Sequence, residues 1–562
     1  MKPSSLRSYS VAESQKSNSE RKDSITTVQQ KTLSTVQKAM TRQDKAILIV
    51  ILFSIFVSWT LYGNIATFYP PYRLEKHKSL SDTQVGIVLS QNISQFITFS
   101  MFEVGVLISS PIIAIVLPKI GRKNSIIIGQ LTCISASIGF GLLVFISDEL
   151  IQGIGDACIS NAGLSIISSE FPSKREHMYG YAESSIGAGL MIGPVIGQAL
   201  YSILDFEYTF FCSAAIVGTS LILTLVLIPQ RINNTSSNER DSITSSQRAE
   251  NDKRISYKMM IKNKRVMIAC ISVIIAMVFM LFFETILADQ LLAIGVSKDH
   301  VGNLIKFDFK ILRLGYIYSI MSLVYTVFSP FVGFFCDKLK KIYITQFSFF
   351  LATIALIFYG PSKLLGLPGY LYFKQSQIIR TLPFMIVGMI LLGFACPLII
   401  VPLLPEIIDA VKEKEQIGEN NELNDKASSF FNSSVAIGSL TAPILGGLFN
   451  DLYDFRNTCD IMAIMSCAYA IIFFLINLLP FWISLRNSKQ TKRKLYKNFD
   501  NSTNQNGDYK TFESEKWQFT ARSKVTKDES FNNQLMSSKL SKMSNEKIKD
   551  QALFEKNEKT QI

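Results

Sequence analysis

Residues 187–197 read GAGLMIGPVIG, and residues 436–446 read AIGSLTAPILG. Aligned without a gap, the two stretches share glycine at their third and eleventh positions and proline at their eighth. Both lie inside long apolar runs. Small residues on a membrane helix let a neighbouring helix approach closely, and an internal proline removes one backbone hydrogen bond and favours a kink. The repeat therefore indicates a helical membrane protein built from two related halves.

A second repeat supports the same division of the chain. The dipeptide Ser-Pro at 110–111 recurs at 329–330, each time near the end of an apolar run. In this register Arg122 aligns with Lys341, so the basic residues that follow the two runs also correspond. Two unrelated motifs that repeat with their internal spacing intact predict two matching sets of helices.

Apolar runs of roughly twenty residues recur between the polar ends of the chain. A bilayer core roughly 30 Å thick needs about 20 helical residues, and within lipid a helix satisfies its own backbone hydrogen bonds. The runs are too many and too long for the buried helices of a soluble protein. We therefore predict an all-α integral membrane protein with twelve transmembrane helices in two six-helix pseudo-repeats. The runs lie at about 46–69, 96–118, 125–146, 150–171, 178–201, 208–228, 266–290, 314–336, 342–360, 382–404, 428–450 and 459–484.

The charge distribution predicts the orientation in the membrane. The chain carries a net charge of +13. Its Lys and Arg residues gather in the ends, in the central polar stretch and in alternate loops, as they do on the cytosolic side of membrane proteins. We therefore expect both termini to be cytosolic and expect no nucleic-acid partner. The predicted domains are a disordered cytosolic tail at 1–44, an N-terminal six-helix bundle at 45–229, a cytosolic linker at 230–265, a C-terminal six-helix bundle at 266–485 and a disordered cytosolic tail at 486–562.

Ionisable side chains inside the apolar runs are the candidate binding groups. A charge at membrane depth costs roughly 2.5–3.5 kcal/mol even on a lenient scale, so such residues are functional candidates by default. The runs hold no deep Lys or Arg. An acid-lined interior suits a cationic substrate, with protons as the coupling ion, because a carboxyl group removed from water holds its proton more tightly. The candidates are Glu103, Asp156, Glu183 and Glu284.

The candidate carboxylates also have structural interpretations. Asp156 could pair with backbone or hydroxyl groups, and Glu103 could extend toward the lipid headgroups. Glu183 could reach the headgroups or the loop cations, and its counterpart in the second half is Asn432, which would make the site asymmetric.

Three side chains of the first span, Trp59, Tyr62 and Asn64, form a further candidate feature. They could build an aromatic wall for a cation or anchor the span at the membrane interface. All three histidines are placed in loops, so no histidine relay within the membrane is expected.

Motifs of enzymes and metal sites do not occur in the sequence. It has no phosphate-binding loop, no HExxH and no GxSxG pattern. The eight cysteines include no CxxC pair and lie mostly in apolar runs. We expect a protein that is not an enzyme and that uses no cofactor or metal.

The loop after the eighth predicted span resembles the cytosolic loop motif of the major facilitator superfamily. It reads SPFVGFFCDK at 329–338 and supplies Gly333, Asp337 and Lys338. Its copy after the second span keeps Gly121, Arg122 and Lys123, but has Ala114 where glycine is usual and Pro118 where the acid is usual. The resemblance implies that these residues control the contacts between spans during gating.

Two further stretches resemble motifs of the same superfamily. Gln152 and Gly153 match the Arg-x-x-Gln-Gly motif, with Glu149 at the Arg position. The opening stretch matches the antiporter-type motif, whose helix-packing residues here are Gly187, Gly189, Gly193, Pro194 and Gly197. The resemblance covers about residues 45–485 and implies two six-helix repeats that alternate access to a central site, in a protein expected to work as a monomer.

Details within these stretches resemble the vesicular amine transporter branch, with polyamine transporter-like members nearest. They are QGIGDA at 152–157, EFP at 170–172, Glu183 before Gly187, and GPS at 360–362. The implied function is proton-coupled antiport of small organic cations in a vesicular, vacuolar or plasma membrane. Two alternatives stay open: a carrier for drugs or for neutral or anionic metabolites, and a non-transporting receptor or scaffold. Gln91–Ser100 and Lys306–Gly315 are interpreted as extra segments before spans two and eight, either as real insertions or as errors in the prediction of the chain from its gene.

Overall fold

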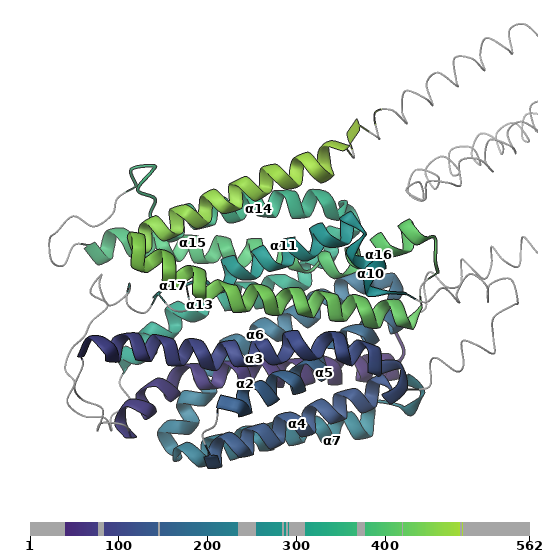
Figure 1. Ribbon diagram of the computed structural model, residues 1–562, viewed down its shortest axis with the longest axis horizontal. Helices are drawn as coiled ribbons and strands as arrows, with labels where there is room; N and C mark the ends of the chain where they lie inside the picture. The colour runs from purple at the N-terminus through teal and green to yellow at the C-terminus, as the bar shows by residue number, and fades with distance from the viewer. Residues whose placement is uncertain are drawn as a thin grey trace, which may run out of the picture. The chain divides into compact units, whose positions relative to one another are not determined.

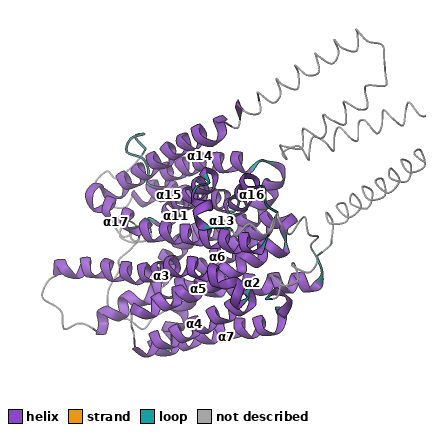
Figure 2. Ribbon diagram, turned by 45° about the vertical axis from the view of Figure 1, so that its right-hand side comes forward, coloured by secondary structure: helices purple, strands orange, loops and turns teal. Residues whose placement is uncertain are grey.

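The computed structural model describes a helical protein, and every regular element among its described residues is a helix (Figure 2). The first part of the chain forms long helices joined by short connections. The described residues are 40–76, 84–143, 146–233, 255–283, 286–287, 290, 309–367, 377–418, 420–480, 482–483 and 486. The first helices are α2 (Arg42–Lys76), α3 (Gln84–Ile120), α4 (Arg122–Leu143), α5 (Ile146–Glu170), η1 (Pro172–Lys174), α6 (Arg175–Ile203), α7 (Phe206–Leu227) and η2 (Gln230–Ile232).

The second part repeats this pattern and has two additional short α-helices among its described residues. Helix α17 contains a break at Asp454, whose backbone φ of 70° and ψ of 167° are not helical, so α17 consists of two arms. Figure 1 shows the two arms bending away from each other. The helices are α10 (Tyr257–Ile261), α11 (Lys264–Leu281), α13 (Phe309–Lys338), α14 (Lys341–Tyr359), α15 (Gln377–Ile400), α16 (Leu403–Glu415), α17 (Asn421–Phe473) and η3 (Phe474–Leu478).

Ten helices among the described residues are long and apolar enough to cross a membrane. Helix α6 has 29 residues and is not among these ten. With α6 added, and with α17 taken as two arms, the described residues offer twelve helical segments for the twelve predicted spans. In both views the helices α2 to α7 lie in one part of the bundle and α11 to α17 in another (Figures 1 and 2). The exact domain boundaries and the two tails stay predictions.

Most predicted spans match an observed helix within a few residues, and two stretches differ. The run at 382–404 ends as α15 at Ile400, and the separate amphipathic helix α16 follows it. Helix α3 continues through Gln91–Ser100 and has 37 residues, which makes it about 55 Å long. The first of the two extra segments therefore lies within one uninterrupted helix. The start of the second stretch, at 306–308, lies outside the described residues.

Glycines set how closely the helices pack around the centre. A Cβ atom at Gly153 would collide with the carbonyl oxygen of Phe102, and one at Gly105 would collide with that of Leu150. Helices α3 and α5 can therefore cross at this separation only because both positions lack a side chain. This crossing brings the middle of α3 and the middle of α5 to the same central region.

Candidate functional site

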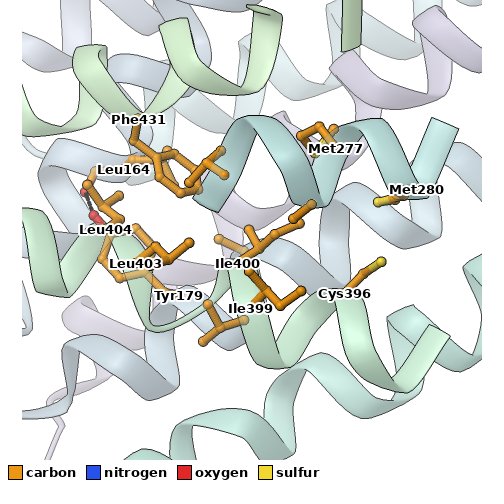
Figure 3. Packing of buried hydrophobic residues seen from close by; sticks show 14 of the residues in the cluster. Leu164, Tyr179, Met277, Met280, Cys396, Ile399, Ile400, Leu403, Leu404 and Phe431 are labelled. Carbon is orange, nitrogen blue, oxygen red and sulfur yellow. Dashed lines mark hydrogen bonds between the residues drawn. The ribbon is translucent and has the colours of Figure 1, made fainter. Parts of the chain in front are cut away.

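A central cavity lies between helices of both halves of the chain. It is lined by side chains of α2, α3, α5, α6, α11, α13, α15 and α17 and has a volume of about 30 Å³. Such a volume holds about two water molecules. Much of the wall is apolar, and Figure 3 shows Leu164, Met277, Met280, Ile400 and Phe431 among the packed side chains that contribute to it.

Asp156 lines the cavity from α5 and is buried. The hydroxyl of Ser58 on α2 donates to its Oδ1 at 2.6 Å, and the hydroxyl of Ser160 donates to the same atom at 3.2 Å. Asp156 therefore combines the two predicted roles. Hydroxyl groups orient its carboxyl group, which still faces the cavity.

Glu183 lines the cavity from α6 and makes a direct contact with the other half of the chain. The hydroxyl of Tyr325 on α13 donates to Glu183 Oε2 at 2.7 Å. Glu183 is only 4% exposed, and its hydrogen bond joins it to a tyrosine rather than to headgroups or loop cations. The close packing of α6 against α13 at Gly187 makes this possible, since a Cβ there would lie 2.7 Å from Thr326 Oγ1.

Glu103 completes the set of acidic side chains around the cavity. It lies on α3, is 2% exposed and lines the cavity with Asp156 and Glu183. A side chain buried in this way does not extend to the headgroups. Among the described residues, no Lys, Arg or His lines the cavity. Glu284, the fourth predicted acid, lies outside the described residues.

Asn432 of α17 lines the cavity at the position that corresponds to Glu183 in the repeat. Its amide Nδ2 donates to Oδ1 of Asn161 on α5 at 2.6 Å. Asn161 is fully buried, and its own amide donates to the carbonyl oxygen of Ser110 at 3.3 Å. The equivalent position of each half therefore makes a hydrogen bond to the opposite half.

The aromatic side chains of α2 lie in the interior. Trp59 lines the cavity, and its ring centroid lies 5.6 Å from that of Tyr62. Tyr62 packs on Phe102 at 4.8 Å. Asn64 instead donates to the hydroxyl of Ser213 on α7 at 2.8 Å. Trp59 is therefore the one of the three predicted residues that contributes to the cavity wall, and all three are buried rather than placed as interface anchors.

Arg122 connects the two halves at the face that the charge pattern predicts to be cytosolic. Its Nε lies 2.9 Å from Oδ1 of Asp425 on α17, and both side chains are almost fully buried. Its guanidinium also donates to Oδ1 and to the carbonyl oxygen of Asn421, at 2.8 and 3.0 Å, and to the hydroxyl of Ser169 at 2.9 Å. The planar guanidinium can satisfy several acceptors at once in a way that lysine cannot.

Lys341, the counterpart of Arg122 in the repeat, makes the mirror connection. Its Nζ lies 2.8 Å from Glu176 on α6 and 2.6 Å from Asp409 on α16. Glu176 corresponds to Asp425 in the register that aligns the two glycine-rich stretches. Two ion pairs related by the repeat therefore hold the halves together at this face, and the additional helix α16 supports one of them.

The rest of the second loop motif contacts α6 directly. A Cβ at Gly333 would lie 2.5 Å from the Cα of His177, so α13 and the start of α6 touch. Nε2 of His177 lies 2.7 Å from Oδ2 of Asp337. Lys338 Nζ lies 4.1 Å from the centre of the Phe334 ring. His177, which is predicted to lie in a loop, lies in the first turn of α6.

The first loop motif organises the turn between α3 and α4. Gly121 has a backbone φ of +89°, a conformation that glycine adopts without strain. Oδ1 of Asn233 accepts the backbone N–H of Lys123 at 2.9 Å, and Lys123 Nζ donates to the carbonyl oxygen of Leu225 at 2.9 Å. Within this motif, Arg122 therefore connects the halves, while its neighbours fix the local turn.

The antiporter-type stretch packs α6 against α2 on a second side. Cβ atoms at Gly189 and Gly193 would lie 2.8 Å from Trp59 Cβ and 2.7 Å from the Thr60 carbonyl oxygen. Gly197 similarly abuts Asn64, and Pro194 lies inside the helix. Close packing is therefore present, while a hinge role stays a prediction. Gln152 is buried beside Gly153 at the crossing of α5 with α3.

Several residues of this arrangement were missed from the sequence. Tyr325, Asn161, Ser58 and Asp425 lie in or beside apolar runs and have no motif of their own. Asp425 could have been found from the sequence, because the register of the repeat aligns it with Glu176.

Comparison with known proteins identifies the family. A model described as Major Facilitator Superfamily matches residues 51–416 and 314–498. The MFS-type transporter SLC18B1 of Rattus norvegicus is 24% identical over 406 residues, which cover 70% of this chain and 78% of that protein. The synaptic vesicular amine transporter of Homo sapiens is 28% identical over 153 residues, 26% of this chain and 30% of that protein.

A solved structure shows the same fold. The crystal structure of the human organic anion transporter MFSD10 (TETRAN) superposes with a TM-score of 0.57 at 12% identity, and covers 77% of this chain and 100% of that chain. At this identity the likeness concerns the fold alone. Because the family model spans well over half of the sequence, this chain belongs to the major facilitator superfamily of multi-pass membrane transporters, which are not enzymes.

Proposed function

We propose that this protein is a proton-coupled antiporter of small organic cations. One observation carries the proposal: carboxyl side chains from three helices, Glu103, Asp156 and Glu183, meet at one buried cavity that no described basic side chain lines. Burial of carboxylates is costly, so a cavity lined by acidic side chains favours either a bound cation or bound protons. Competition between the two for the same groups is the requirement for antiport.

The name of one relative supports a cationic substrate, since it is called a synaptic vesicular amine transporter. The wall adds aromatic and thioether groups, since Trp59, Met277 and Met280 line the cavity. Aromatic faces attract organic cations, and flexible methionine side chains adapt to the apolar surface of such a ligand.

The contacts at the predicted cytosolic face support a gated cycle. Arg122 with Asp425, and Lys341 with Glu176, join the halves on that face. The cavity has space for about two waters, which is less than an organic amine occupies. We infer that substrate entry from the cytosol requires these pairs to separate, and that both termini lie on the same side.

We assign the cation-binding role to Asp156 and Glu183 together. Asp156 is oriented by two hydroxyl groups, while Glu183 is oriented by one tyrosine from the other half. Glu103 adds a third acid to the set of carboxyl groups for which the substrate and the protons compete. Protein of this design needs no cofactor and is expected to act as a monomer.

The test is uptake into proteoliposomes with an acidic interior, using labelled spermidine, tyramine and tetraethylammonium. The double variant Asp156→Asn, Glu183→Gln should lose gradient-driven uptake completely. Glu207→Gln is the matched control, because Glu207 is an exposed acid at the start of α7. Normal uptake by the double variant would refute the assignment. Uptake of neutral or anionic metabolites alone would favour a different cargo, and no uptake of any compound would favour a receptor or scaffold.

A further inference from the structure

One hydrogen-bond donor in the wall of the central cavity has no acceptor among the described residues. The side chain of Trp59 lines the cavity from α2 and is 6% exposed. Its indole Nε1 is buried and donates to no atom of the described chain. A buried tryptophan N–H usually finds a hydrogen-bond partner, because a buried donor without one costs free energy. The wall therefore presents a donor that a ligand can use.

The other neutral donor groups of the wall already have partners within the protein. The hydroxyls of Ser160 and Tyr325 donate to carboxyl groups of the cavity at 3.2 and 2.7 Å. The amide Nδ2 of Asn432 donates to Oδ1 of Asn161 at 2.6 Å. Among the described residues of the wall, Trp59 is thus the one whose single N–H is unused.

The indole is held next to the carboxyl group that binds the cation in the proposed function. Trp59 directly follows Ser58, whose hydroxyl donates to Asp156 Oδ1 at 2.6 Å. Its ring centroid lies 5.6 Å from that of Tyr62, and a Cβ at Gly189 of α6 would lie 2.8 Å from Trp59 Cβ. The donor and the carboxyl group line the same small cavity, so one small molecule can contact both.

The cationic group of a substrate cannot use this donor. A protonated or quaternary nitrogen has no lone pair, so it cannot accept a hydrogen bond from the indole N–H. Alkylammonium groups such as that of lysine have a pKa of about 10.4, so simple alkylamines are protonated at neutral pH. The oxygen of a hydroxyl, ether or carbonyl group can accept the bond. The donor therefore matches a second, uncharged group on the substrate.

We infer that Trp59 Nε1 determines specificity, and that the preferred substrate is an organic ammonium ion that also carries an oxygen able to accept a hydrogen bond. The carboxyl groups hold the ammonium group, and Trp59 donates to the oxygen. This inference rests on the proposed function and narrows its substrate class. Simple alkylamines and fully protonated polyamines lack such an oxygen, so they bind without this hydrogen bond.

Displacement of water makes the donor selective. A water molecule in the cavity can accept from the indole and satisfy it. The cavity has space for about two water molecules, so an amine that enters it displaces them. An amine with an oxygen then replaces the lost hydrogen bond, whereas an analogue without the oxygen leaves the N–H unpaired. A site built to hydrogen-bond a substrate group disfavours the analogue that lacks this group for the same reason.

The experiment compares tyramine and 2-amino-1-phenylethanol with 2-phenylethylamine, which has the same skeleton and no oxygen. Calorimetry on purified full-length protein gives the Kd of each amine at neutral pH. The variant Trp59→Phe keeps an aromatic face and removes the N–H. For at least one oxygenated amine, the ratio of its affinity to that of 2-phenylethylamine should be about tenfold larger in wild type than in Trp59→Phe.

The ratio separates a hydrogen bond from packing. If Trp59 only packs against the ligand, Trp59→Phe weakens all three amines alike and leaves both ratios unchanged, which would overturn the inference. Trp482→Phe is the matched control, because Trp482 is 50% exposed and does not line the cavity. It should leave the wild-type ratios as they are.

Indole fluorescence gives a second readout that keeps Trp59 in place. The chain has three tryptophans, and the double variant Trp482→Phe, Trp517→Phe leaves Trp59 as the only one. A hydrogen bond donated by the indole N–H shifts its emission to longer wavelength. The preferred oxygenated amine should therefore shift the emission further than 2-phenylethylamine does. Identical spectra with all three bound amines would contradict the inference.

Transport distinguishes this inference from the proposed function. Proton-coupled uptake of the amines with affinity ratios that do not depend on Trp59 would refute the inference and leave the antiporter intact. Binding ratios that depend on Trp59, without proton-coupled uptake of any amine, would support the inference and refute the antiporter. Wild-type protein that binds none of the three amines would refute both.

Discussion

The buried ion pair between Arg122 and Asp425 allows a quantitative prediction about the contacts that close the predicted cytosolic face. The Nε–Oδ1 distance is 2.9 Å, and the two side chains are 6% and 3% exposed. Arg122→Ala would leave the Asp425 carboxylate buried beside the Ser165 hydroxyl that donates to it. Removal of one partner from a buried ion pair costs about 3–5 kcal/mol. This cost applies to the closed state, because water solvates Asp425 once the halves separate.

The lower figure already predicts a large shift in conformation. About 3 kcal/mol corresponds to a change of roughly 100-fold in the ratio of closed to open protein. Ser184 of α6 lies against α13, because its hydroxyl donates to the carbonyl oxygen of Thr326 at 2.7 Å. The rate at which a maleimide labels the thiol of Ser184→Cys should therefore rise toward that limit when Arg122→Ala is added. Arg122→Lys should give an intermediate rate, because lysine keeps the charge but cannot reproduce the several bonds of the guanidinium.

A charge-matched control lies on the same face. Arg231 pairs with Glu170 at 2.9 Å within the first half, and its side chain is 46% exposed. Exposed pairs contribute only about 0–1 kcal/mol, so Arg231→Ala should leave the labelling rate almost unchanged. Equal rates for Arg122→Ala and Arg231→Ala would refute the view that the buried pair holds the gate closed.

Three further predictions concern other parts of the fold. Lys341→Ala should also speed labelling, but less than Arg122→Ala, because Lys341 and its partners are partly exposed and water screens their charges; a larger effect would contradict this ranking. Gly193→Val should abolish transport, since its Cβ would lie 2.7 Å from a backbone oxygen of α2. As a control, Gly218→Ala places its Cβ in open space, so it should keep transport and raise the free energy of unfolding by up to about 1 kcal/mol. Arg456→Ala removes bonds to the carbonyl oxygens of Pro361 and Leu367 and should lower the free energy of unfolding by about 1–3 kcal/mol, seen as a reduced Tm with an unchanged labelling rate; an unchanged Tm would contradict it.

The positions of the helices were largely predictable, because lipid imposes length and polarity on each span. Helix α16 was missed, although LLPEIIDAVKEKE at 403–415 spaces its apolar residues with a helical period. The predicted run at 382–404 included the start of α16 and so joined this helix to the preceding span. The break at Asp454 fell between two predicted runs and so agreed with the sequence.

The site was predictable as a list of residues but not as an arrangement. Glu103, Asp156 and Glu183 each stood out as acids in apolar runs, yet their meeting at one cavity depends on glycine contacts between helices. Tyr325 did not stand out, because a tyrosine in an apolar run is common. Its importance follows from the acid that its hydroxyl reaches.

The most direct test of the antiporter is to measure proton movement rather than amine movement. Proteoliposomes that contain a pH-sensitive dye and an acidic interior receive tetraethylammonium or spermidine outside. Under proton-coupled antiport, the added cation should make the interior more alkaline. The double variant Asp156→Asn, Glu183→Gln should give no such signal, and Glu207→Gln should behave as wild type. Uptake of the cation without any loss of internal protons would contradict proton-coupled antiport.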